Sequence, residues 1–162
     1  MSKLFFSILL FLFVVLPACE AQKEFVVVDQ RELLGAVFKE TTREFNNRNG
    51  SEDLEQNFSL NRQFRYAIDL KLNTNSGLRR QDVEERICET YNIANCRTGG
   101  QKQCLLPVSV PAGRAYAYEI EWTEVKREGV IREGNDPDRG NLLGTYTIVV
   151  DLQCQTVGVQ VR

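Results

Sequence analysis

The sequence predicts an α+β fold: an antiparallel sheet with a long C-terminal hairpin, one or two helices packed on one face, and two disulfides. Three observations support this prediction. Hydrophobic residues alternate with polar ones in two segments near the C-terminus. In two other segments they recur at three- and four-residue steps, which is typical of helices. Four cysteines follow an N-terminal segment typical of exported proteins.

The first 21 residues resemble a secretory signal peptide. Met1–Lys3 form a short basic start, and Leu4–Leu16 is apolar apart from one serine. This run is too short to cross a bilayer, which needs about 20 apolar residues. The small residues Cys19 and Ala21 suit cleavage after Ala21, which would leave residues 22–162 as the mature chain.

A second interpretation of this segment is a bacterial lipoprotein signal. Leu16-Pro17-Ala18-Cys19 resembles a lipobox, so that residues 1–18 would be removed and Cys19 lipidated. Pro17 departs from the usual residues at its position, and the first predicted strand begins at Phe25, which leaves almost no tether. We therefore favour soluble secretion, and an uncleaved membrane anchor ranks third because the apolar run is short. Either cleavage predicts an extracytoplasmic protein, secreted or in the periplasm or on the cell surface.

Both cleavage routes leave the same four cysteines in the mature chain, and we expect them to form two disulfides. No pair has Cys-x-x-Cys spacing, and the chain has no histidine to complete a mixed zinc site, so no metal site is expected. Four cysteines allow three connectivities. The pattern favours Cys88–Cys154, joining a helix to the sheet, with Cys96–Cys104 closing a nine-residue loop.

Residues 22–162 are expected to form a single globular domain, because about 140 residues suffice for one stable core. A short strand is predicted at Phe25–Val28. Asp29 can then cap a helix, and Glu32 completes a capping box. Residues at three- and four-residue steps extend this predicted helix to about Asn46: Leu33, Leu34, Val37, Phe38, Thr41 and Phe45.

The middle of the chain predicts a strand, a helix and an irregular stretch. A strand is predicted over Gln63–Leu72, where every second residue is apolar. A highly charged helix is predicted over Arg80–Tyr91, whose apolar residues lie four positions apart. Asn92–Pro111 contains two glycines, two cysteines and two prolines, and is predicted to be irregular.

The C-terminal third gives the clearest prediction. Tyr116–Thr123 and Thr145–Cys154 alternate between apolar and polar residues around the turn-rich Gly134–Gly140, which predicts a long antiparallel hairpin. Gly129 is a candidate bulge, and Val157–Val161 is a candidate final short strand. The aromatic residues of the hairpin are assigned to the buried face rather than to an exposed ligand strip: Tyr116, Tyr118, Trp122 and Tyr146.

Composition disfavours several classes of function. Lysine and arginine total 20 against 22 for aspartate and glutamate, so no strong field would attract nucleic acid, and no nucleic-acid partner is expected. Without histidine, a single chain cannot form a Ser-His-Asp or Cys-His catalytic site. The glycines lack a phosphate-loop context, and no cofactor is expected. Whether the protein is an enzyme is left open, with a non-catalytic role favoured.

Carboxylates are the remaining candidates for catalysis or ligand binding. Glu119, Glu121 and Glu124 lie around Trp122, a pattern similar to a glycosidase pair beside an aromatic sugar platform. Strand periodicity puts Glu119 and Glu121 on one face, about 7 Å apart. A solvated sheet face explains the same residues, and we favour that explanation. Glu119, Glu121 and Trp122 are nevertheless the candidate ligand face.

Asn49-Gly50-Ser51 and Asn57-Phe58-Ser59 are sequons for N-glycosylation. Both lie in the turn-like stretch between the first predicted helix and the next strand, and exposed loops suit this modification. The sequons have meaning only in a eukaryotic host. Asn49 and Asn57 are therefore conditional glycosylation sites.

The predicted layout loosely resembles that of the cystatins over Phe25–Leu72, where a helix follows a short strand and precedes long antiparallel strands. Cystatins also carry a Gln-x-Val-x-Gly hairpin. The nearest segment here, Gln155–Val159, has its glycine one residue early, and the second helix is extra. No family is claimed and no inhibitory residues are carried over, but the resemblance adds a secreted protease inhibitor to the candidate functions.

These observations favour an exported, non-catalytic binding domain of the cell envelope, cell surface or extracellular space. Its expected partner is an unidentified extracytoplasmic protein or glycan, and membrane contact is expected only if Cys19 is lipidated. A small carboxylate-dependent secreted hydrolase and a protease inhibitor are the alternatives.

Overall fold

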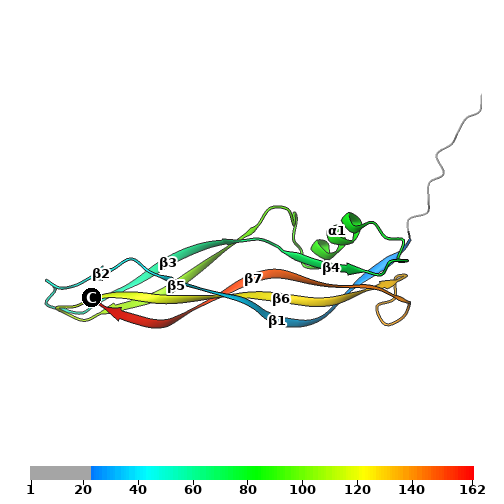
Figure 1. The fold of residues 1–162 in the computed structure, drawn as a ribbon. Helices are drawn as coiled ribbons and strands as arrows, with labels where there is room; N and C mark the ends of the chain where they lie inside the picture. Colours follow the sequence, from blue (N-terminus) through cyan, green and yellow to red (C-terminus); the bar gives the residue numbers. More distant parts are fainter. Residues whose placement is uncertain (1–22) are drawn as a thin grey trace, which may run out of the picture.

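Three long antiparallel strands run along most of the molecule and form its main sheet (Figure 1). The computed structural model describes residues 23–162; the predicted signal segment, its cleavage site and Cys19 lie outside them. The strand order is β1-β6-β7-β4, and β2 pairs with the start of β6. The strands of this sheet are β1 (Phe25–Thr41), β2 (Phe45–Asn46), β4 (Ile68–Leu72), β6 (Ala115–Glu133) and β7 (Leu142–Val161).

Two further elements cover the sheet, and Figure 1 shows both on the same side of β6 and β7. The first is a two-stranded antiparallel ribbon of β3 (Leu54–Phe64) and β5 (Gly100–Val110). The second is the helix α1 (Arg80–Thr90), which contacts β1 and β4. The described chain is therefore mostly antiparallel sheet with one short helix, which confirms the predicted sheet but gives less helix than expected.

The half of the sheet under the ribbon, here called the ribbon half, has its own hydrophobic core. Trp122 of β6 is fully buried there and lies directly opposite Cys154 of β7. The buried residues of this core are Phe45, Cys104, Leu106, Val108, Val110, Tyr118, Ile120, Trp122 and Leu152.

The half under α1, here called the helix half, has a second core. Val83 and Ile87 of the helix are fully buried against the sheet. The other buried members of this core are Val27, Leu70, Ile131, Leu143, Tyr146 and Ile148. The assignment of the hairpin aromatics to the buried face is confirmed for Tyr118, Trp122 and Tyr146, and Tyr116 is partly buried.

The predicted helix over Asp29–Asn46 is wrong, because most of this segment belongs to β1. Two register shifts in β1, between Asp29 and Arg31 and between Leu34 and Val37, interrupt the two-residue alternation of the strand. Apolar residues on either side of such a shift fall three or four positions apart and imitate helical spacing. The cystatin-like layout, which depended on this helix, is therefore absent from the described residues.

Two other strand predictions need correction. Gln63–Leu72 is not one strand, because residues 65–67 carry the chain from the end of β3 to the start of β4. Phe64 packs on the ribbon-half core and Ile68 on the helix-half core, so one alternating pattern serves two cores. Within the predicted irregular stretch Asn92–Pro111, residues 100–110 form β5, whose even-numbered residues from Cys104 onward are buried.

The predicted helix over Arg80–Tyr91 is present as α1. Val157–Val161 is not a separate strand but the end of β7. Gly129 is not itself the bulged residue; it lies in β6 opposite Asp29, beside the register shift in β1. A Cβ atom there would collide with the carbonyl oxygen of Val28 and the ring of Tyr146, so glycine is required by this close approach.

All four cysteines form disulfides, but the connectivity differs from the favoured one. The bonds are Cys88–Cys96, with Cα atoms 6.0 Å apart, and Cys104–Cys154, with Cα atoms 6.2 Å apart. Cys88–Cys154 does not form because Cys88 lies in the helix half and Cys154 in the ribbon half. One bond therefore closes a local loop, and the other joins β5 to β7.

Candidate functional site

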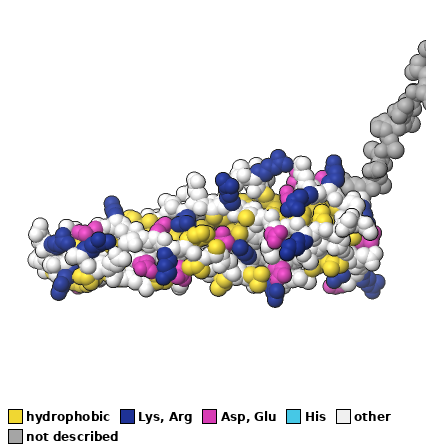
Figure 2. All heavy atoms as spheres, in the orientation of Figure 1, with side chains coloured by type: hydrophobic (Ala, Val, Ile, Leu, Met, Phe, Trp, Pro, Cys, Tyr) yellow, Lys and Arg dark blue, Asp and Glu magenta, His cyan; other side chains and the backbone are white. Residues whose placement is uncertain are grey.

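A groove of about 600 Å³ lies along one flank of α1. The helix forms one side of the groove. Another side is formed by Tyr66, just before β4, and by Ile68, the first residue of β4, and residues 93–97 complete the lining. Figure 2 shows hydrophobic side chains exposed between charged ones over this half of the molecule. A second, smaller hollow of about 430 Å³ is lined by residues 63–65 and 99–101.

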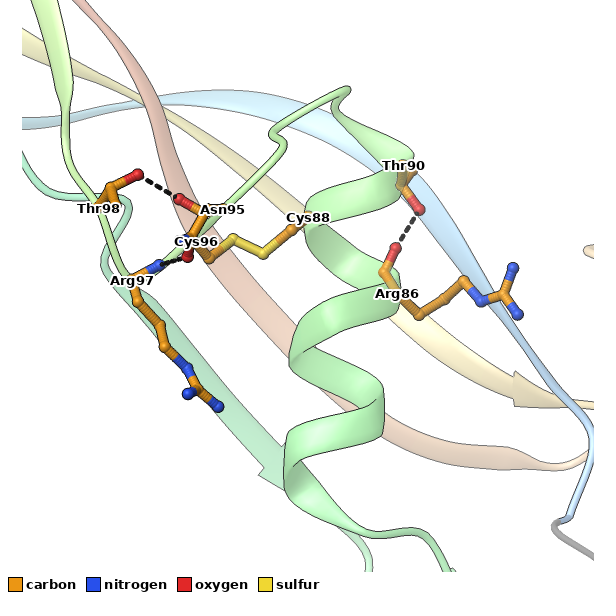
Figure 3. The surroundings of a disulfide bond; sticks show 7 residues. All are labelled: Arg86, Cys88, Thr90, Asn95, Cys96, Arg97 and Thr98. Carbon is orange, nitrogen blue, oxygen red and sulfur yellow. Dashed lines mark hydrogen bonds between the residues drawn. A yellow bond between two sulfur atoms is a disulfide. The ribbon is translucent and has the colours of Figure 1, made fainter.

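The local sequence after α1 explains how the groove wall is built. Asn92 has a positive φ of 55°, a conformation that asparagine tolerates and that commonly ends helices. The N–H of Ile93 then donates to the carbonyl oxygen of Cys88 (2.9 Å), which turns the chain back along the helix. Cys96 is thereby brought to Cys88, and the disulfide fixes the loop against α1 (Figure 3).

The end of the loop is held by Asn95. Its side-chain oxygen accepts the backbone N–H of Arg97 (2.9 Å), and its carbonyl oxygen accepts the hydroxyl of Thr98 (2.8 Å), as Figure 3 shows. This is the local side-chain turn that asparagine forms readily. It places Arg97 in the groove lining beside Cys96.

The groove combines an apolar base with an acidic rim. Tyr66, Ile68 and Ile93 provide the apolar surface, and three glutamates of α1 line the same groove with Arg97 as its only lining cation. Each glutamate has a neighbour on the helix: Glu84 pairs with Arg80 (2.7 Å), Glu85 accepts from Gln81 (2.9 Å), and Glu89 pairs with Arg86 (3.5 Å). These exposed contacts are weak and can be exchanged for contacts with a ligand.

The other flank of α1 carries a polar cluster that the sequence analysis did not anticipate. Tyr91 donates its hydroxyl to Asp29 (2.9 Å) and shares a hydrogen bond with the hydroxyl of Tyr146 (2.9 Å). Arg127 also binds the Asp29 carboxylate, with Nε 3.1 Å from Oδ1. Asp29, which was expected to cap a helix, therefore lies in β1 and binds Tyr91 at the end of α1 and Arg127 of β6. Through Tyr91 the cluster also reaches Tyr146 of β7.

The pKa values in this cluster follow from burial and hydrogen bonding. Burial, together with hydrogen bonds to Tyr146 and Asp29, raises the pKa of Tyr91. Burial likewise raises the pKa of Tyr146, and the hydrogen bonds that Arg127 donates to Asp29 raise the pKa of Arg127. Both tyrosines therefore stay neutral at physiological pH. Their hydrogen bonds hold the end of α1 against the sheet.

The structure separates the members of the predicted ligand face. Glu119 and Glu121 lie near Lys39 of β1, whose Nζ is 3.1 Å from Glu119 and 4.0 Å from Glu121. Trp122 is buried in the ribbon-half core and cannot form a platform for a ligand. Glu124 accepts the backbone N–H of Ala36 (3.2 Å) and pairs with Lys126 (3.2 Å). These carboxylates belong to an ion-paired sheet surface.

The two sequons lie at exposed positions of the ribbon half. Asn49 is in the turn after β2, as expected for a loop. Asn57 instead lies in β3, opposite Pro107 of β5. Both side chains are accessible to solvent.

Within residues 23–162, no group of three or more His, Cys, Asp or Glu side chains is arranged to hold a metal ion. No α-helix in the same range is long and apolar enough to span a membrane. No protein-family model, curated protein or solved structure matches the chain. Function must therefore be argued from the groove itself.

Proposed function

We propose that this protein is an exported, non-catalytic binding domain that uses the groove beside α1 to bind an extracytoplasmic protein. The single observation that carries the proposal is the groove, which has an apolar base, an acidic rim and a disulfide-fixed wall. Its volume of about 600 Å³ is in the usual range for ligand sites, roughly 300–1,000 Å³. Such a groove suits a short segment with an apolar side chain next to a lysine or arginine.

The charges of the groove favour a basic protein segment over a glycan. Glutamates at positions 84, 85 and 89 line the groove against one lining cation, Arg97, and Glu85 has no arginine or lysine partner among the ion pairs of the helix. The aromatic ring at the base, Tyr66, packs edge-to-face on Phe64 with centroids 5.3 Å apart. One ring engaged in this way is a small platform for sugar stacking.

The disulfides support an extracytoplasmic location, because disulfides persist in oxidising compartments. The Cys88–Cys96 bond also bears on binding. A loop held in place before the partner arrives loses less conformational entropy on binding, so the wall of the groove is prepared for its ligand.

The proposal is tested by selecting peptides from a random display library on the immobilised processed protein. We expect enriched peptides to share a lysine or arginine next to a large apolar residue. Calorimetric titration should then show binding at least about tenfold weaker to Glu85→Lys/Glu89→Lys, because rim charge reversal opposes the ligand charge. Glu55→Lys/Glu44→Lys, exposed and in the ribbon half, is the matched control.

Two outcomes would contradict the proposal. One is a set of enriched peptides without basic residues. The other is equal affinity of the enriched peptides for the groove variant and for the unchanged protein, since that would place the binding surface elsewhere.

A further inference from the structure

The C-terminal half of β7 forms an unpaired edge of the main sheet. β4 pairs only with residues 144–148 of β7, so residues 150–161 have β6 on one side and no strand of the described chain on the other. A free edge of this kind presents backbone N–H and C=O groups that can pair with another strand.

This edge lacks the charges that usually protect free edges. β1, at the opposite side of the sheet, carries five charged residues and two register shifts, and β4 carries Asp69 and Lys71 in five residues. In contrast, Leu152–Val161 contains no charged residue and no proline. Its exposed large side chains are Val157, Val159 and Val161. Natural edges commonly use charge or proline to prevent strand addition, and this one does not.

We propose that two copies of this protein pair through this edge, as antiparallel β7 strands about a twofold axis. The charges at the two ends of the segment identify the occupant. Asp151, which is partly exposed and also pairs with Lys102 of β5 (2.6 Å), precedes the uncharged stretch, and Arg162 follows it. Antiparallel pairing over the full segment sets Arg162 of each copy opposite Asp151 of the other. Parallel pairing would set like charges together, which destabilises cross-strand pairs.

The faces of the two strands match in the same register. A register shift between Glu119 and Ile120 skips Val157, so the residues of β7 facing the core change from even to odd numbers. Cys154 lies opposite Trp122, whereas Val159 lies opposite Tyr118, and both partners belong to the ribbon-half core. Pairing Asp151 with Arg162 sets Cys154 of one copy opposite Val159 of the other, on the same face. A slip of one residue would put core-facing and outward-facing side chains together.

The paired edge leaves the groove free. Figure 1 shows the end of β7 at the opposite end of the molecule from α1. The pairing therefore does not depend on the proposed function, and a dimer of this kind would carry one groove near each end.

Sedimentation equilibrium of the processed protein, from about 1 to about 100 µM, tests the pairing. We expect a reversible dimer. Val159→Lys should weaken it at least about tenfold, because a charge enters an apolar edge. Leu142→Lys is the matched control, since both side chains are 46% exposed and Leu142 lies at the other end of β7. A monomer at every concentration overturns the proposal, as does a dimer that Val159→Lys leaves intact.

A charge exchange tests the register independently, and it decides the matter if Val159→Lys fails to fold. Arg162→Glu should weaken the dimer, because it sets a carboxylate opposite Asp151. The triple variant Lys102→Glu/Asp151→Lys/Arg162→Glu should restore it, because opposite charges again face each other between the copies and also within the pair of residues 102 and 151. Circular dichroism of each variant confirms that it is folded. A dimer insensitive to Arg162→Glu, or one that the triple variant fails to restore, overturns the antiparallel arrangement.

Discussion

The ribbon half and the helix half cover the same sheet by different means. Over the ribbon half, apolar side chains of β5 pack on Trp122, and the Cys104–Cys154 bond joins residues 50 positions apart. Over the helix half, one short helix is fixed by a polar cluster and by a bond between residues only 8 positions apart. Both halves have a hydrophobic core, and the comparison teaches that the candidate binding surface lies in the half whose disulfide is local and whose helix is also held by polar contacts.

The largest expected effect is on the ribbon-half core. Trp122→Ala should lower the free energy of unfolding by about 3–5 kcal/mol, because it empties a fully buried aromatic site. Denaturant unfolding measures this loss. Leu34→Ala, at an exposed position of β1, is the control and should change stability by no more than about 0.5 kcal/mol. A small effect of Trp122→Ala would contradict the tight packing of the ribbon-half core around this side chain.

The two disulfides sharpen the comparison further. In the chain-entropy treatment, a bond closing about 50 residues contributes about 4 kcal/mol and one closing about 9 residues about 2.5 kcal/mol. Cys104→Ala/Cys154→Ala should therefore destabilise the protein more than Cys88→Ala/Cys96→Ala, as measured by denaturant unfolding. Hydrogen exchange should show the second variant loosening chiefly residues 80–99. Equal losses, or loosening spread over both halves, would contradict the division.

The smallest expected effect concerns the polar cluster. Tyr91→Phe should cost about 1 kcal/mol, because it removes the hydroxyl that bonds to Asp29 and Tyr146. The raised pKa of Tyr91 means that the folded state holds this proton more tightly than the unfolded state. That contribution is complete below the unfolded tyrosine pKa of about 10 and is lost as the pH rises above it.

Thermal unfolding followed from about pH 8 to about pH 11.5 checks this dependence. The melting temperature of the unchanged protein should fall through the alkaline range, and the fall should be shallower for Tyr91→Phe. Tyr116→Phe, in the ribbon half, is the control and should follow the unchanged protein. If the melting temperature fell equally with pH in all three proteins, the polar cluster would not contribute to the stability of the helix half.

The sequence predicted the sheet, the charged helix and the disulfide-bonded state, because these depend on local period and on composition. It failed at β1, where two register shifts made Leu34, Val37 and Phe38 look like a helical face although all three are exposed. It failed at β5 because Pro107 argued against a strand, whereas a two-stranded ribbon is made of edge strands that tolerate proline.

The candidate site was less predictable than the fold. The groove brings together residues from positions 66 to 97, and its wall depends on the Cys88–Cys96 connectivity, which spacing alone did not determine. The signal available in the sequence was Asn92 directly after the charged helix, because asparagine often ends helices in a left-handed conformation. For Trp122 the sequence allowed two interpretations: its alternation with glutamates fits an exposed platform as well as a buried core, and the buried face that was favoured is confirmed.

The direction of the strands has a mechanical consequence. β1 begins at the end of the molecule near α1, and β7 finishes at the other end (Figure 1). Tension between Phe25 and Val161 would act along the strands and slide β1 and β7 against β6, rather than peel one strand away. Sliding loads the hydrogen bonds of a ladder together, whereas peeling breaks them one at a time, so this strand arrangement opposes stretching along the sheet more than peeling across it.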